Sequence, residues 1–216
     1  MFEQFVLAAR WAEVERLGQA NGLGHHGVGQ GVERVVAQLA QHLCDLIIVG
    51  ADVAVDEEFI ERNGTEWRDV LDLALGSANS VLKEVGVRIE MVSVSTWESD
   101  DDQAHMSRIL DGVLAVTPRG TGRLLLAVTC QDSDRFDGIA RDSEAAVVVR
   151  YNHDNWRYTG SLIAHEIAHL LGAAHHPEDE ECESDGCVME PAGYADVTEW
   201  CDDHREDIRA YLARAA

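Results

Sequence analysis

The chain has 216 residues, of which 46% are hydrophobic and only three are prolines. This composition can build the core of one ordinary domain and argues against disorder. The formal net charge is -23, from 40 acidic and 17 basic residues, and Lys83 is the single lysine. Such an anionic surface repels phosphates, so we expect neither nucleic acid nor an anionic membrane as a partner. The charge is typical of an Arg-rich genome or of adaptation to high salt, and the sequence does not choose between them.

No apolar run approaches the ~20 residues that a membrane span needs. The first 18 residues contain neither a basic leader nor an uninterrupted apolar stretch, so we expect no signal peptide in this chain. Residues 1–42 carry two amphipathic patterns around a Gly-rich loop. We interpret them as an N-terminal helical extension or the remnant of a pro-region, and expect the main domain to span residues 43–216.

Strand and helix patterns alternate from residue 45 onward. Apolar, β-rich segments at 45–53, 87–97, 123–129 and 145–151 predict strands, and the helical spacing over 65–85 predicts a helix. Ser99 is the expected cap of a further helix that reaches residue 116, and residues around Asp137 and Gly138 are typical of turns. The alternation predicts the α/β class, with a mostly parallel twisted sheet and helices packed on it.

The segment "HEIAHLLGAAHH", residues 165–176, indicates a metal site. A helix that Thr159 is expected to cap would place His165 and His169 on one face, one turn apart. Two imidazoles so placed can hold one Zn²⁺ at ~2.0–2.1 Å. Glu166 is offset by one step around the helix, which suits a base acting on water better than a third ligand.

Gly172 is expected to end this helix, because glycine accepts the left-handed backbone of a sharp exit. The turn can bring His175 back as the third ligand. Three protein ligands leave a fourth position for water, which is typical of a catalytic zinc site. We therefore expect one catalytic Zn²⁺.

The string from His165 to His175, followed fourteen residues later by Met189 in "CVMEP", resembles the metzincin signature with its Met-turn. Over residues 45–212 the chain most resembles the adamalysin (reprolysin) family. The segments that carry this likeness are "LIIVGADVAVDEEF", "VRIEMVSVSTWESDDD", "AVVVRYNHD" and "DVTEWC".

The resemblance implies a zinc endopeptidase whose polypeptide substrate lies in a cleft along a sheet edge. It implies that Glu166 is the general base, that Met189 lies in a turn below the zinc, and that Pro191 walls the pocket beside the scissile bond. The alternative is a catalytically silent zinc-binding protein that uses the fold to bind a partner. The sequence determines neither the cleavage preference nor the natural substrate.

The resemblance suggests a disulfide between Cys182 and Cys187, and leaves open whether Cys130 pairs with Cys201. Paired cysteines and the family favour an extracellular location, and we expect a monomer. Cys44 is more typical of a packing residue than of a thiol that caps zinc. The acidic run at 178–185 could bind Ca²⁺, although such runs are more often solvated loops. His176 occupies the position after the third histidine, where the family usually has Asp. It could be a fourth zinc ligand, although we expect three.

Overall fold

The computed structural model describes residues 46–100, 102–118, 120, 123–133, 136–151, 155–176, 186–190 and 197–215. Within these ranges five strands form one sheet in the order β2-β1-β3-β5-β4. The strands are β1 (Ile47–Asp56), β2 (Val87–Trp97), β3 (Leu124–Thr129), β4 (Gly138–Arg141) and β5 (Ala146–Arg150). Neighbouring strands run parallel, except that β4 is antiparallel to β5 at one edge. The predicted α/β class and mostly parallel sheet are thus confirmed.

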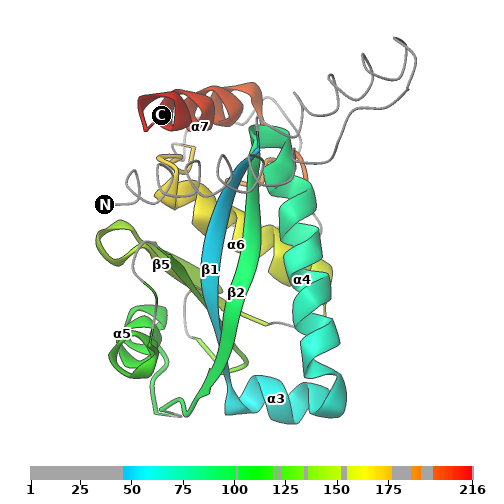
Figure 1. Cartoon of the computed structure of the whole chain (residues 1–216), viewed down its shortest axis with the longest axis vertical. Coiled ribbons are helices and arrows are strands. Elements are labelled where there is room, and N and C mark those ends of the chain that lie inside the picture. Colours follow the sequence, from blue (N-terminus) through cyan, green and yellow to red (C-terminus); the bar gives the residue numbers. More distant parts are fainter. Residues whose placement is uncertain are drawn as a thin grey trace, which may run out of the picture.

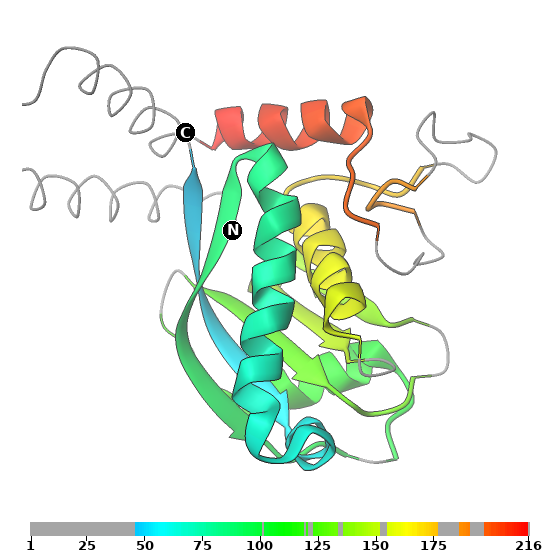
Figure 2. The same cartoon turned by 90° about the vertical axis from the view of Figure 1, so that its right-hand side faces the viewer.

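The helices lie on both faces of this sheet (Figure 1). They are α3 (Glu57–Asn63), α4 (Trp67–Leu82), α5 (Met106–Val116), α6 (Trp156–Leu170) and α7 (Asp202–Arg214), with short 3₁₀ turns η1 (Gly64–Glu66), η2 (Lys83–Val85) and η3 (Asp142–Glu144). The long helices α4 and α6 cover one face and α5 covers the other, while α7 lies across one end of the α4–α6 layer (Figure 2). None of the helices described has the length and apolar character that a membrane-spanning segment needs.

Side chains of the central strands alternate between two hydrophobic cores. In β3, Leu124, Leu126 and Val128 pack in the core under α4 and α6. Leu125 and Ala127 point the other way, into the core under α5. Successive side chains of a strand point to opposite faces, so a parallel strand covered on both sides is apolar throughout. This arrangement explains the unbroken hydrophobic run that predicted β3.

A glycine sets the position of α6 against α4. A Cβ atom on Gly160 of α6 would lie 2.4 Å from the Cβ of Ser77 and 2.7 Å from the carbonyl oxygen of Ala74, both on α4. Any side chain at Gly160 would therefore push the two helices apart. Because α6 carries the predicted metal ligands, this close contact fixes their position over the sheet.

Two helix starts differ from the prediction. Asn155, not Thr159, caps α6, and its side chain accepts hydrogen bonds from the backbone N–H groups of Arg157 and Tyr158. Helix α5 begins only at Met106, because Ser99 is engaged elsewhere: its backbone N–H and its hydroxyl both donate to the Glu57 carboxylate. At α6 a different residue forms the cap, and at α5 the expected cap is bonded to a side chain distant in sequence.

Three elements were not predicted, namely α3, the edge strand β4 and the C-terminal helix α7. The expected extension at residues 1–42 lies outside the described residues, as does its boundary with the main domain. That division stays a prediction.

Candidate active site

Helix α6 and the turn that follows it bring three histidines together. His165 and His169 are one turn apart, with their Nε2 atoms separated by 3.2 Å. The Nε2 atom of His175 lies 2.9 Å from that of His165 and 3.1 Å from that of His169. The structure therefore assembles the three predicted ligands around one point.

Gly172 makes the required reversal of the chain after α6. Its φ is +86°, in the left-handed region that favours glycine. The backbone N–H of Ala173 donates to the carbonyl oxygen of Ala168 at 3.0 Å, and that of Gly172 donates to the carbonyl oxygen of His169 at 3.1 Å. This pair of bonds is the Schellman motif, which closes the carbonyl end of a helix. The predicted end of the helix at Gly172 is confirmed.

Backbone carbonyls fix the tautomers of two of these histidines. The Nδ1 atom of His165 lies 2.6 Å from the carbonyl oxygen of Val188, and that of His169 lies 2.9 Å from the carbonyl oxygen of Ala173. A carbonyl only accepts, so each Nδ1 carries the proton and each Nε2 presents a lone pair to the centre.

The spacing of the three Nε2 atoms fits a zinc ion. Zn²⁺ bound to imidazoles at ~2.0–2.1 Å in tetrahedral geometry separates the nitrogens by about 3.3 Å, close to the distances found here. Burial also lowers the pKa of all three imidazoles, that of His165 to about 4. Neutral rings are the form that binds a metal, so the cluster is prepared for a cation near neutral pH.

Glu166, which follows His165 on α6, is buried. Its side chain is 5% exposed and packs against Gly138 of the edge strand β4. Burial raises the pKa of the Glu166 carboxyl to about 8. A carboxyl with such a pKa can both take up and release a proton near neutral pH.

A tight turn at residues 187–190 contacts His165. The backbone N–H of Glu190 donates to the carbonyl oxygen of Cys187 at 3.0 Å, which places fully buried Met189 inside the turn. The carbonyl of Val188 in the same turn accepts the hydrogen bond from His165. A hydrogen bond from the backbone N–H of Val188 to the carbonyl oxygen of Glu199 holds this turn in place. Pro191 lies outside the described residues.

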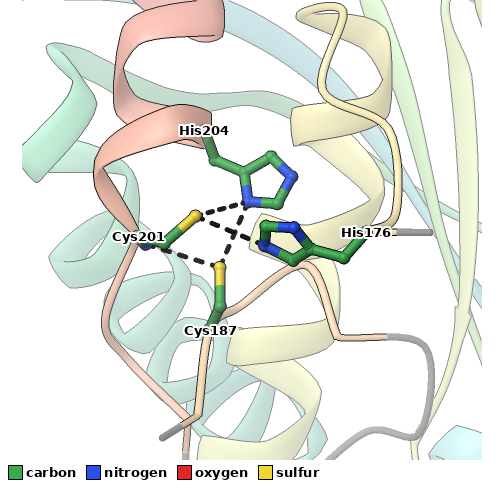
Figure 3. Close-up of side chains that lie close together, drawn as sticks. All are labelled: His176, Cys187, Cys201 and His204. Atoms are coloured by element: carbon green, nitrogen blue, oxygen red, sulfur yellow. Dashed lines mark hydrogen bonds between the residues drawn. The ribbon is translucent and has the colours of Figure 1, made fainter. Parts of the chain in front are cut away.

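The structure groups His176 with residues other than the three histidines. It lies with Cys187, Cys201 and His204 in a second cluster, which we call the Cys₂His₂ cluster (Figure 3). Sequence reasoning did not identify His204 as part of a site. The signal was available, because the spacing Cys201-x-x-His204 places both side chains on the first turn of one helix.

The disulfide expected between Cys182 and Cys187 does not occur in the structure, where Cys187 is a free cysteine. Its sulfur instead faces the Nδ1 atom of His204 at 3.3 Å. Cys130 is also a free cysteine, and so does not pair with Cys201. Cys44, Cys182 and the acidic run at 178–185 lie outside the described residues.

Comparison with known proteins agrees with this geometry. A reprolysin-type family model described as metallo-peptidase family M12 matches residues 44–201. No curated protein matches the sequence.

Several solved structures share the fold. Archaemetzincin from Methanopyrus kandleri is 16% identical with a TM-score of 0.53, and the match covers 77% of this chain and 96% of that one. A zinc-dependent peptidase from Methanocorpusculum labreanum is 14% identical with a TM-score of 0.50, covering 74% and 100%. A structure of a chaperone–substrate complex matches at 9% identity and a TM-score of 0.56. The match covers 79% of this chain but only 35% of the chain in that complex.

Proposed function

Because the chain belongs to metallo-peptidase family M12, we propose that it is a zinc endopeptidase, with His165, His169 and His175 as the zinc ligands and Glu166 as the general base. The observation that carries this proposal is the convergence of three Nε2 atoms within 3.2 Å of one another, on a helix that also carries the buried carboxyl of Glu166. Three ligands leave room for water and substrate, as catalytic zinc sites require.

A Zn²⁺ ion held by the three histidines would supply a Lewis acid that polarises a peptide carbonyl and makes water a stronger acid near neutral pH. The protein side chains supply the remaining functions. Glu166 takes a proton from the attacking water and passes it to the leaving amine. The carbonyls of Val188 and Ala173 hold the His165 and His169 rings in the ligating tautomer.

The edge strand β4 is the proposed position of the substrate. Among the described residues β4 pairs only with β5, so its other edge offers backbone groups to an extended peptide. Gly138 at the start of β4 touches the Glu166 carboxyl, so a peptide added along this strand would pass the general base. In this proposal Gly172 and the Met189 turn shape the zinc site, and Pro191 would line the adjoining pocket.

The alternative is a zinc-binding protein without peptidase activity. Casein or gelatin hydrolysis by the purified zinc-loaded protein, with and without a chelator, separates the two. The proposal predicts hydrolysis that the chelator abolishes and that added zinc restores. Glu166→Gln should keep its zinc yet lose activity by ~10²-fold or more, the usual contribution of general-base catalysis. Zinc-loaded wild-type protein that cleaves neither substrate would favour the silent alternative.

A further inference from the structure

The Cys₂His₂ cluster draws its four side chains from three separate segments. His176 directly follows His175, Cys187 opens the turn that holds Met189, and Cys201 and His204 lie at the start of α7. The side chains point toward one common centre (Figure 3). His176 is half-buried and the other three are buried.

The ligand atoms of the cluster lie close enough together to surround a single tetrahedral metal. The Nδ1 atom of His204 lies 3.0 Å from the sulfur of Cys201 and 3.3 Å from that of Cys187. The Nε2 atom of His176 lies 3.4 Å from the sulfur of Cys201, and all four ligand atoms lie within 4.8 Å of one another. Tetrahedral Zn²⁺, with bonds of ~2.3 Å to sulfur and ~2.0–2.1 Å to nitrogen, separates such atoms by about 3.3–3.8 Å.

Hydrogen bonds around the cluster prepare its atoms to bind a cation. The Nε2–H of His204 donates to the carbonyl oxygen of Ala174 at 2.7 Å, so its Nδ1 presents a lone pair to the two sulfurs. That lone pair can accept only one S–H, although both sulfurs lie close to it. The backbone N–H of Cys201 donates to the sulfur of Cys187 at 3.4 Å, which helps to hold that sulfur at the centre of the cluster.

We propose that His176, Cys187, Cys201 and His204 bind a second Zn²⁺ ion in a closed, structural site. Two thiolates and two imidazoles are a ligand set that zinc prefers, and four protein ligands leave no position for substrate. Two thiolates also balance the charge of the ion, so the buried site is neutral overall, which limits the cost of removing it from water. Histidine nitrogens and cysteine sulfurs would select zinc over Ca²⁺ or Mg²⁺, which prefer oxygen.

The position of this second site indicates its role. It joins the start of α7 to the Met189 turn and to the chain just after the third histidine. Val188, whose carbonyl orients His165, follows Cys187 directly. The second metal would thus fix both the third ligand and the Met189 turn of the active site.

The test is zinc content measured on the full chain. Wild-type protein should hold two Zn²⁺ per chain, and Cys187→Ser and Cys201→Ser should each hold one. The matched control, Cys130→Ser, removes a half-buried thiol outside the cluster and should keep two. A single zinc in the wild type, or two in both cluster variants, would overturn the proposal.

Two measurements on the unsubstituted chain keep the proposal testable if the variants fail to fold. Replacing zinc by Co²⁺ should produce a thiolate-to-cobalt charge-transfer band, which a site of three histidines cannot give. Cys187 and Cys201 should resist alkylation in the metal-loaded protein and react after chelation. Alkylation of both cysteines in the loaded protein, no such band, or a disulfide at Cys187 would each refute the second site. These readouts do not depend on peptidase activity.

Discussion

The Cα atom of Gly138 faces the carboxyl group of Glu166 so closely that a Cβ on this glycine would lie 2.6 Å from Oε1 and 2.9 Å from Cγ. Gly138 begins the edge strand β4, and Glu166 lies between two histidines of α6. The fit therefore links the proposed substrate strand to the proposed general base. A single methyl group at Gly138 would have to displace the buried carboxyl.

Gly138→Ala should accordingly lower kcat while the zinc content stays unchanged. A displacement of about 1 Å at a catalytic group can reduce the rate by up to ~10²-fold, so we expect a loss of roughly 10- to 100-fold in casein hydrolysis. Gly76→Ala is the matched control, because a Cβ at Gly76 on α4 meets nothing within 4 Å. Equal activity of the two variants would show that the position of Glu166 does not limit the reaction.

The role of the three histidines predicts the effect of removing one of them. His169→Ala should lose one zinc ion per chain by elemental analysis, because two imidazoles bind the metal far less tightly than three. An exposed histidine outside the site, His105 at the start of α5, supplies the control: His105→Ala should keep the wild-type zinc content. Full zinc content in His169→Ala would contradict the ligand assignment.

Much of this fold could be predicted from local patterns. The strand runs and the helix over residues 65–85 were correct to within a few residues, since apolar periodicity follows directly from which faces are buried. The zinc string predicted the convergence of three histidines, because helix geometry and one left-handed glycine determine it. Each of these features depends on residues close together in sequence.

The features that were missed depend on distant parts of the chain. Strand β4 is only four residues long, and its pairing with β5 decides that it is a strand rather than a turn. His204 and His176 are 28 positions apart in sequence, and only the packing of α7 brings the centroids of their rings within 4.4 Å of each other. The family resemblance suggested that Cys187 pairs with Cys182, whereas the structure turns the Cys187 sulfur toward His204.

The buried carboxylate of Asp52 on β1 predicts a stability effect away from the active site. Asp52 accepts hydrogen bonds from the Ser93 hydroxyl at 2.6 Å, the Gly120 backbone N–H at 2.6 Å and the Arg123 guanidinium at 2.7 Å. Burial acts to raise the pKa of this carboxyl, but the three hydrogen bonds and the positive charge of Arg123 lower it below its ordinary value of 3.8. The folded state therefore favours the carboxylate.

Asp52→Asn should reduce the free energy of unfolding by ~2 kcal/mol near neutral pH, since hydrogen bonds to a charged group contribute about 1.5–3 kcal/mol. A depressed pKa stabilises the fold above the unfolded-state pKa, and this stabilisation is lost as the pH falls through the lower folded-state pKa. The gap between wild type and Asp52→Asn should therefore be constant from pH 5 to 8 and shrink below about pH 4.

Urea unfolding at a series of pH values measures this gap. Asp72→Asn, which removes the same charge from an exposed position on α4, should leave the free energy of unfolding within about 0.5 kcal/mol of wild type. A gap between wild type and Asp52→Asn that widens at acid pH would contradict the assigned direction of the pKa shift.

The net charge of -23 predicts that salt stabilises the protein. Folding draws the like charges together, so their repulsion opposes the compact state. The Debye length falls from ~10 Å at 0.1 M to ~3 Å at 1 M, and repulsion between distant carboxylates fades over that range. Salt also weakens surface ion pairs, but each contributes only ~0–1 kcal/mol, and 17 basic residues can form few of them. The melting temperature should therefore rise from about 0.1 to 2 M NaCl.

A parallel series in tetramethylammonium chloride separates screening from salting-out, because only screening raises the melting temperature in both salts. If the melting temperature stays flat or falls in both, high-salt adaptation is wrong and the Arg-rich, Lys-poor composition reflects the genome.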